Sequence, residues 1–367
     1  MIYSIQITKE KEQMSSIPFD EKELNILSVK DLGRRVKRIY DRPISDAENM
    51  SRTHRQREPV WMPSPMDTLN IDPICIPDNI ARGMVSGAEH IDNATQAGGP
   101  DMYGIQWEYS MEARGSMVRP GTEVLDDAND WKEIITLPDV DSWNWKESAE
   151  ANRELLQSGE WITTTLYSGA WFERLVSFMG FENAAVALID EDQEDAVQEL
   201  FTATTDVICK VIDKIAEYFP QVNCIRVHDD WGGQAQPFFS LDTGMDVIVP
   251  HMKRTVDHIH SKGMIADLHS CGHTESRVEC FMEAGWDSWT PQPMNDMDML
   301  FREYGDKMIF GVRLEDRPED DEAAVRLADD IADRFVVKGR PIRVGAFFDS
   351  EAFEKELYRR SRLGYQD

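Results

Sequence analysis

The stretch GMIADLHSCGH, residues 263–273, joins a short apolar run to two imidazoles and a thiol. The apolar half predicts a buried β-strand, and Gly272 allows a tight turn where that strand ends. His269 and Cys271 stand two positions apart at this end, so both side chains can point at one ion, as a zinc site requires. The alternative is a polar pocket that an imidazole and a thiol line without a metal.

The same pattern of a short apolar run followed by a stretch of helical period recurs along the chain. The candidate strands are residues 59–64, 103–109, 161–168, 222–228, 263–269, 286–292, 308–314 and 341–348. The predicted helices are residues 194–219, 246–262, 276–284 and 321–335. Parallel strands that alternate with helices predict an α/β fold, and eight such strands predict a (β/α)8 TIM barrel. Residues 65–102 and 110–160 are rich in Pro, Gly, Asp and Asn, and we expect them to be long insertions after the first two strands.

The first fifty residues are set apart by their dense charge. Within them, KELNILSVKDLGRRVKRIY at residues 22–40 alternates charge with Leu, Ile and Val at helical spacing. We therefore expect a charged N-terminal helical arm over residues 1–50 and one catalytic barrel domain over residues 51–367. The arm is a candidate contact for a homodimer.

Composition and charge exclude several classes of protein. The chain has 367 residues, of which 41% are hydrophobic, and this is enough for a full core. Its 68 acidic and 39 basic residues give a net charge of −29, which repels nucleic acid and anionic membranes. Five dispersed cysteines make a poor disulfide framework, and the N-terminus lacks the pattern of a signal peptide. We expect a soluble cytoplasmic protein that binds neither nucleic acid nor membranes.

In a TIM barrel the catalytic groups follow the carboxyl ends of the strands. VHDDWGGQ at residues 227–234 is such an end, and its His228, Asp229, Asp230 and Gln234 are candidate catalytic residues. Asp230 and His228 could supply a proton or a metal ligand. Either aspartate could instead cap the loop or helix that follows, and Gln234 could satisfy loop backbone groups.

Side chains suited to a small-molecule substrate lie at the same strand ends. The amides could orient a substrate oxygen, and the aromatic rings could enclose a flat donor, although core packing explains about half of the rings. The candidate substrate-binding residues are Trp107, Tyr167, Trp171, Trp231, Gln292 and Asn295.

Several segments, in this order and spacing, resemble the uroporphyrinogen decarboxylase superfamily, which includes cobalamin-dependent methyltransferases. The segments are PVWMPSPMD (59–67), PDMYGIQWEY (100–109), GAWFERLVSFMGFEN (169–183), DDWGGQ (229–234), FFSLD (238–242), DLHSCG (267–272), EAGWDSWTPQ (283–292) and YGDKMIFGVRLED (304–316). The resemblance spans about residues 55–350 and implies a (β/α)8 barrel, in agreement with the strand pattern.

Two features select a branch of this superfamily. The decarboxylases carry arginines after the first strand, in the pattern PVWLMRQAGR, whereas this chain has Ser64 and Thr68 at those places. His269 and Cys271 match the His-x-Cys pair of the methyltransferases. The resemblance therefore implies a methyltransferase that works with a corrinoid (cobalamin) carried by a partner corrinoid-binding protein.

The resemblance to the zinc-containing methyltransferases is incomplete. Those that activate a thiol carry a further cysteine after the last strand, where this chain reads VGAFFDSEAF at residues 344–353. A carboxylate such as Asp349 or Glu351 would have to complete a zinc set with His269 and Cys271, or the metal is absent. Loss of a soft ligand favours an oxygen leaving group over a thiol acceptor.

The expected reaction is therefore transfer of a methyl group from a methoxylated, aromatic small-molecule donor to the Co(I) of the partner protein. Three alternatives stay open. The first is a decarboxylase of a small carboxylate, and the second is methyl transfer from a methylcorrinoid to a thiol or a folate. The third is a barrel that only binds.

Overall fold

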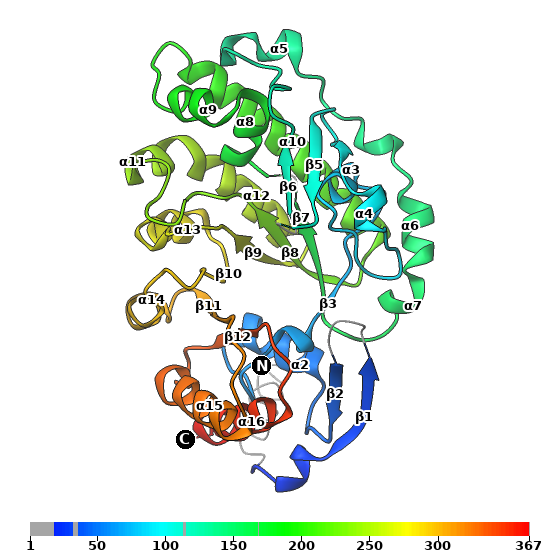
Figure 1. Cartoon of the computed structure of the whole chain (residues 1–367), viewed down its shortest axis with the longest axis vertical. Helices are drawn as coiled ribbons and strands as arrows, with labels where there is room; N and C mark the ends of the chain where they lie inside the picture. Colours follow the sequence, from blue (N-terminus) through cyan, green and yellow to red (C-terminus); the bar gives the residue numbers. More distant parts are fainter. Residues whose placement is uncertain (1–17, 32–35, 113–114, 168, 367) are drawn as a thin grey trace, which may run out of the picture. The chain divides into compact units, whose positions relative to one another are not determined.

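The computed structural model describes residues 18–31, 36–112, 115–167 and 169–366, which fall into two compact units (Figure 1). The larger unit is Leu69–Asn295. The smaller unit combines the described residues up to Thr68 with those from Asp296 onward.

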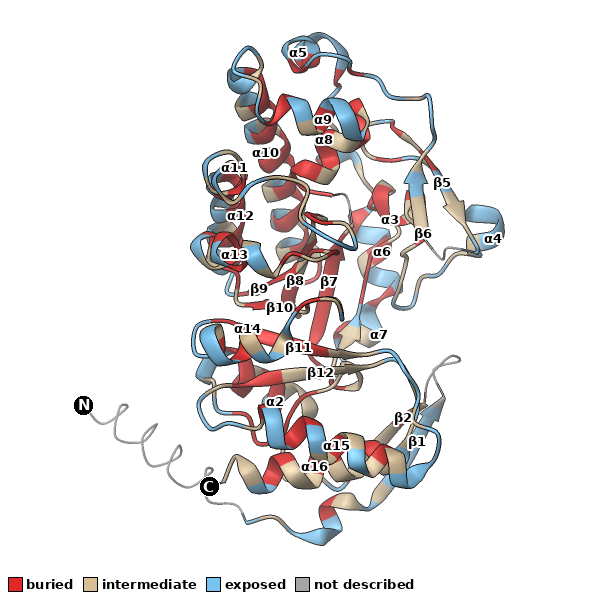
Figure 2. Ribbon diagram, turned by 60° about the vertical axis from the view of Figure 1, so that its left-hand side comes forward, coloured by how far each residue is buried: buried red, intermediate tan, exposed pale blue. Residues whose placement is uncertain are grey.

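The larger unit is built on parallel strands in the order β3, β7, β8, β9 and β10. Their bounds are β3 (Leu69–Asn70), β7 (Ile162–Leu166), β8 (Val222–His228), β9 (Ile265–His269) and β10 (Ser288–Trp289). Strand β7 is buried along its whole length, which fits a parallel strand that is covered on both faces (Figure 2). The strands predicted at 161–168, 222–228, 263–269 and 286–292 are thus present.

Helices alternate with these strands, as the periodicity predicts. The helices of the larger unit are α3 (Pro77–Ala81), α4 (Asn93–Gln96), α5 (Trp131–Ile134), α6 (Trp145–Ala151), α7 (Arg153–Leu156), α8 (Phe172–Met179), α9 (Phe181–Ala187), α10 (Glu194–Tyr218), α11 (Leu241–Thr243), α12 (Val249–Ser261) and α13 (Val278–Ala284), with short 3-10 or π turns at Ala128–Asp130, Val140–Ser142, Gly244–Ile248 and Glu275–Arg277. Helix α12 packs against β9, α10 and α13 (Figure 1). Within the described ranges, no helix is long and apolar enough to cross a membrane.

One predicted barrel strand belongs to a different sheet. Residues 103–109 contain β5 (Gln106–Ser110), which pairs antiparallel with β4 (Gly99–Pro100) and β6 (Gly115–Val118). The prediction of a strand was right, but its place in the parallel sheet was wrong, because a local pattern does not specify the partner strand. The small sheet and α3 to α7 form one long excursion between β3 and β7.

The smaller unit contains a second parallel pair, β11 (Ile309–Leu314) with β12 (Ile342–Ala346). Both strands were predicted. The helices of this unit are α2 (Asp46–Ser51), α14 (Met297–Tyr304), α15 (Asp321–Phe335) and α16 (Glu351–Gly364), with short 3-10 or π turns at Glu21–Leu24, Arg52–Gln56 and Pro65–Asp67. Helix α15 packs along α16 and has the predicted bounds.

The expected strand at residues 59–64 is absent, so this prediction was wrong. The segment is irregular, although Pro63 accepts a hydrogen bond from the backbone N–H of Val344 in β12 (2.9 Å). Three prolines at positions 59, 63 and 65 remove backbone donors and so prevent a regular ladder.

The helical arm was also predicted wrongly where it is described. In place of a helix, the structure has strands β1 (Ile26–Asp31) and β2 (Val36–Tyr40), which pair antiparallel. The β-branched Ile and Val residues of this segment favour a strand, and this preference outweighs the helical spacing of its apolar residues. The part of the predicted arm over residues 1–17 lies outside the described residues.

A buried ion pair fastens the start of this segment to α16. The carboxylate of Glu23 accepts hydrogen bonds from Arg362 (2.7 and 2.9 Å) and from the hydroxyl of Tyr358 (2.6 Å). Trp61 packs against the ring of Tyr358 with a centroid distance of 5.5 Å. Glu23 is therefore buried against α16 in the smaller unit.

Candidate metal and active site

Two imidazoles lie face to face at the carboxyl ends of β8 and β9. The parallel pairing aligns His228 with His269, and their ring centroids are 4.4 Å apart with the planes inclined by 15°. Nε2 of each ring lies 3.8 Å from Oδ1 of Asp230. Donor atoms around a tetrahedral zinc are about 3.3 Å apart, because each lies about 2.0–2.1 Å from the ion. The three donors are too far apart for hydrogen bonds and close to the spacing of a metal ligand set.

The turn after β9 places Cys271 beside this cluster. Its Sγ lies 3.2 Å from Nε2 of His269, and its backbone N–H donates to Oδ1 of Asp230 (2.7 Å). Gln292 approaches the sulfur with Nε2 at 3.3 Å and accepts a hydrogen bond from the N–H of Gly272 (2.7 Å). The predicted pair His269 and Cys271 thus shares one corner of the site with Asp230 and Gln292.

Only glycine fits at position 272. Its φ is +93°, and a Cβ there would lie 2.1 Å from the carbonyl oxygen of Gly232. The turns after β8 and β9 therefore approach backbone to backbone. This close approach holds the aspartate of one turn against the cysteine of the other.

Two residues that sequence reasoning missed orient His228. Oε2 of Glu173 lies 2.6 Å from Nδ1 of His228, and Oε1 accepts from Arg82 (2.7 Å). Arg82 in turn lies over the ring of Trp107, 4.3 Å from its centroid. A carboxylate at Nδ1 fixes the proton there and leaves the Nε2 lone pair for the side of Asp230. Glu173 follows the strand at 161–168, which could have identified it, whereas nothing marks Arg82 within its insertion.

Burial and mutual charge set the protonation of the cluster. Burial opposes ionisation of Glu173, but Arg82 and His228 outweigh it and hold the pKa of this carboxyl below its usual value. Burial likewise opposes the charged form of His228, but Glu173 and Asp230 raise its pKa. Burial, with the charges of His228 and Arg226, holds the pKa of His269 well below its usual value. His269 is therefore a neutral ring near pH 7, as metal binding requires.

If the cluster holds a metal ion, the variant Glu173→Gln is expected to weaken metal retention and activity by about 10–100-fold, as loss of an outer partner of a ligating histidine does. The amide can still accept from His228, but it carries no charge to favour the Nδ1–H form. Competition with a chelator measures retention, and Glu182→Gln on the exposed face of α9 is the matched control. Equal retention by both variants would contradict the orienting role of Glu173.

The two adjacent aspartates have different environments. Asp229 is fully buried, and its carboxylate accepts the backbone N–H groups of Ala170 (3.2 Å), Trp171 (3.1 Å) and Glu173 (3.0 Å). It also accepts the indole N–H of Trp231 (2.7 Å), and burial raises its pKa to about 6. Asp229 therefore holds the start of α8, whereas Asp230 faces the imidazoles. In Asp230, burial raises the pKa, and the charge of Glu173 adds to this effect.

Asp229→Ala is expected to lower the free energy of unfolding by about 3 kcal/mol, because several buried donors would lose their acceptor. Asp229→Asn keeps an acceptor oxygen and should lose less. Urea denaturation of both variants tests this, with activity measured on the folded fraction. Unchanged stability together with lost activity would instead make Asp229 part of the chemistry.

The predicted substrate-binding residues fall into two groups. Trp107, Trp171 and Trp231 are buried, and their indole N–H groups donate to Asp101 (2.9 Å), Thr205 (3.0 Å) and Asp229 (2.7 Å). These rings belong to the packing. Tyr167 lies beside the imidazoles, with its ring centroid 6.3 Å from that of His228.

The predicted amides also differ in surroundings. Asn295 is buried, accepts the N–H groups of Thr274 and Glu275 (2.9 Å each), and donates to the carbonyl of Gly272 (3.0 Å). It therefore supports the turn after β9. Gln234 is exposed in the loop after β8. Of the predicted groups, Cys271 and Tyr167 lie next to the imidazole pair, and Gln292 contacts Cys271.

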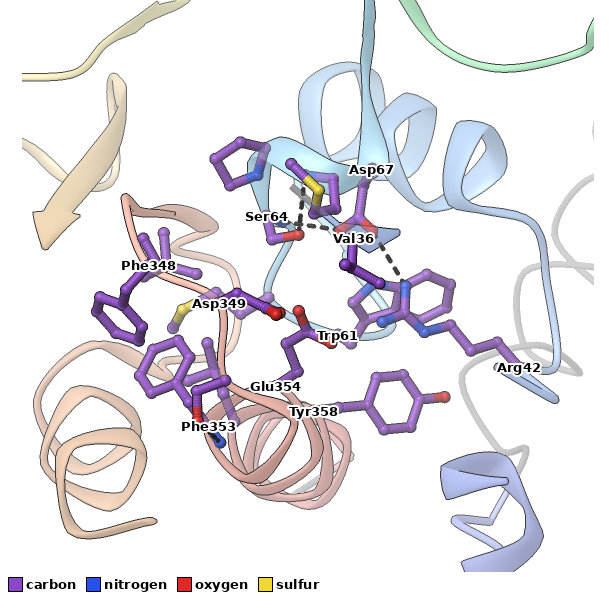
Figure 3. Close-up of a pocket in the computed structure, with 17 residues that line it drawn as sticks. Val36, Arg42, Trp61, Ser64, Asp67, Phe348, Asp349, Phe353, Glu354 and Tyr358 are labelled. Atoms are coloured by element: carbon purple, nitrogen blue, oxygen red, sulfur yellow. Dashed lines mark hydrogen bonds and ion pairs between the residues drawn. The ribbon is translucent and has the colours of Figure 1, made fainter. Parts of the chain in front are cut away.

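Asp349, the predicted third metal ligand, lies in the smaller unit at a cavity of about 60 Å³. Figure 3 shows Asp349 and Glu354 at this cavity, together with Arg42 near Trp61 and Tyr358. Nη1 of Arg38 donates to Asp349 (2.7 Å) and to Glu354 (3.1 Å). The Asp349 carboxylate is therefore paired with a cation in its own unit, and ligation by it stays a prediction.

No family model and no curated protein matches this chain. Among solved structures, a methyltransferase from Methanosarcina mazei matches 87% of this chain and 99% of its own, with a TM-score of 0.58 and 10% identity. The chain has a TIM-barrel-like α/β fold. The predicted fold class is thus confirmed, while a likeness at this identity concerns the fold alone.

Two glycan-related enzymes also match, at lower similarity. Xylanase B from Clostridium stercorarium F9 covers 56% of this chain and 73% of its own, with a TM-score of 0.33 and 10% identity. A 3-keto-D-glucoside 4-epimerase from E. coli covers 67% of this chain and 89% of its own, with a TM-score of 0.34 and 12% identity. These scores are too low to bear on function.

Proposed function

We propose that this protein is a methyltransferase that takes the methyl group of a methoxylated aromatic donor and passes it to Co(I) of a corrinoid on a separate protein. The observation that carries the proposal is the cluster of His228, Asp230 and His269 with Cys271 beside it. The fold likeness to a methyltransferase and the His-x-Cys pair support it. The corrinoid would arrive bound to its own protein, so this chain needs no resident cobalamin site.

The donor set suits a divalent metal ion, with zinc as the first candidate. His228, Asp230 and His269 would hold it, and Cys271 would stand as an adjacent soft donor. When bound, the ion would supply positive charge for the oxygen that leaves as the methyl group departs.

The residues of the chain would act on the donor as follows. Tyr167 would form an aromatic wall next to His228, and Glu173 would keep His228 in the required tautomer. The bond between the methyl carbon and the ether oxygen would break with its electron pair on oxygen, and the Co(I) of the partner protein would supply the pair for the new bond. Asp230, whose pKa burial raises, is the residue that would give a proton to the departing oxygen if no ion is present.

The test is to mix the protein with a reduced corrinoid protein and a panel of aryl methyl ethers, and to follow the absorbance change that accompanies methylation of cobalt. We expect methylation that depends on both proteins. Transfer from methylamines or methanol but from no aryl ether would overturn the donor class. Release of carbon dioxide from a small carboxylate without any corrinoid would favour the decarboxylase alternative.

A further inference from the structure

An ion pair lies one layer below the imidazoles in the larger unit. Side chains alternate along a strand, so Arg226 lies on the same face of β8 as His228, and Asp267 on the same face of β9 as His269. The parallel pairing sets Arg226 beside Asp267. Inward positions of such barrels are normally filled by branched apolar side chains, so a charged layer here departs from ordinary packing.

This ion pair leaves most of the arginine available. Nε of Arg226 donates to Oδ2 of Asp267 (2.6 Å), and the hydroxyl of Ser288 donates to the other carboxylate oxygen. The Asp267 side chain is 1% exposed, whereas that of Arg226 is 31% exposed. Within the part of the chain that the structure describes, Nη1 and Nη2 of Arg226 donate to no protein acceptor. A fixed guanidinium with two open Nη groups is the geometry that binds a carboxylate through two hydrogen bonds.

We propose that Arg226 binds a carboxylate on the methyl donor, so that the preferred donor is a methoxylated aromatic acid. The role of the methoxyl group in this inference rests on the proposed function, but binding of the acid does not. The Cα atoms of residues i and i+2 of a strand, such as Arg226 and His228, are about 6.6 Å apart. The two para substituents of a benzene ring span a similar distance. An acid group at Arg226 would thus bring the ether oxygen beside His228 and His269.

Charge supports the assignment to this residue. The other arginine near the imidazoles, Arg82, is committed to Glu173 (2.7 Å) and to the ring of Trp107. The chain carries a net charge of −29, which repels an anionic donor at a distance. Recognition of an acid therefore needs a local cation with open donors, and Arg226 provides one.

The experiment compares two probes of the same shape, 4-methoxybenzoate and its uncharged amide 4-methoxybenzamide, by isothermal titration calorimetry. The unmodified protein is expected to bind the acid at least about tenfold more tightly than the amide, because a hydrogen-bonded charge pair is lost in the amide. Equal affinity for the two probes would overturn the inference.

Variants of Arg226 locate the effect. Arg226→Lys keeps a cation beside buried Asp267 but loses the planar fork, so the preference for the acid should fall severalfold while amide binding holds. The double variant Arg226→Gln with Asp267→Asn removes both charges together and avoids an uncompensated buried carboxylate, and its preference should vanish. Arg153→Gln, which removes an exposed arginine of α7, is the control and should keep the preference. Preference for the acid in the double variant would overturn the role of Arg226.

Failure of this inference and failure of the proposed function give different results. If the acid binds preferentially through Arg226 but no corrinoid is methylated, the inference stands and the methyltransferase proposal falls. If the corrinoid is methylated equally well from the amide and the acid, the proposed function stands and the inference falls.

Discussion

Under the proposed function, protein that carries His269→Ala is expected to retain little zinc and to slow methyl transfer by about 10²–10⁴-fold. Burial keeps the His269 ring neutral, and its Nε2 is 3.8 Å from Asp230 and 3.2 Å from the sulfur of Cys271. The alanine variant lacks the imidazole nitrogen that lies next to both Asp230 and Cys271. The unmodified protein, purified without chelator, should carry close to one zinc per chain by elemental analysis, and the variant a small fraction of that.

The control for this experiment is His260→Ala. His260 pairs with Asp287 at 2.8 Å and is not a member of the His228, Asp230 and His269 cluster, so its loss should leave the zinc content unchanged. The zinc content of Cys271→Ala should lie between those of His269→Ala and His260→Ala, because the sulfur adjoins the cluster. Active unmodified protein without any metal would refute the metal assignment and leave Asp230 as the acid.

Asp230→Asn is expected to slow the demethylation of unactivated aryl ethers by about 10²–10⁴-fold and that of ethers with electron-withdrawing substituents by much less. The reason is that a poor leaving phenolate needs charge stabilisation or a proton most. The asparagine oxygen can still accept the N–H of Cys271, so the turn should keep its form. The test measures the demethylation rate for a series of aryl methyl ethers and plots the logarithm of the rate against the pKa of the phenol that leaves. The slope of this plot should be steeper for the variant, and the zinc content is measured in parallel.

Asp257→Asn, at an exposed position on α12, controls for loss of a carboxylate elsewhere in the acidic surface. Its slope should match that of the unmodified protein. If Asp230→Asn slows all ethers by the same factor, Asp230 acts in positioning and does not bear on the charge of the leaving oxygen.

Residues of the same type and neighbouring position have different roles in the structure. Asp229 and Asp230 are adjacent, yet one accepts backbone N–H groups of α8 and the other faces two imidazoles. The three tryptophans predicted to bind substrate are buried in the core, whereas the ring of Tyr167 lies beside that of His228. His228 and Asp230, which the sequence offered as proton donors or metal ligands, lie beside His269, and the predicted ligand Cys271 adjoins them. Ligation by Asp349 stays a prediction.

By itself the sequence determined the alternation of strands and helices and the polar residues that follow β8 and β9. These features are local, because apolar periodicity and a strand end can be recognised within a dozen residues. For this reason the positions of His228, His269 and Cys271 at one edge could be predicted. Helix α15 was likewise predicted with its observed bounds.

Only the tertiary structure decided which partner each segment takes. The pattern of residues 22–40 suited a helix, but β1 and β2 of this segment pair antiparallel, and β5 joins an antiparallel sheet. Glu173 and Arg82 come from segments far from the histidines in the sequence and meet His228 only after folding. Pairing and side-chain contact depend on residues distant along the chain, so no local pattern could specify them.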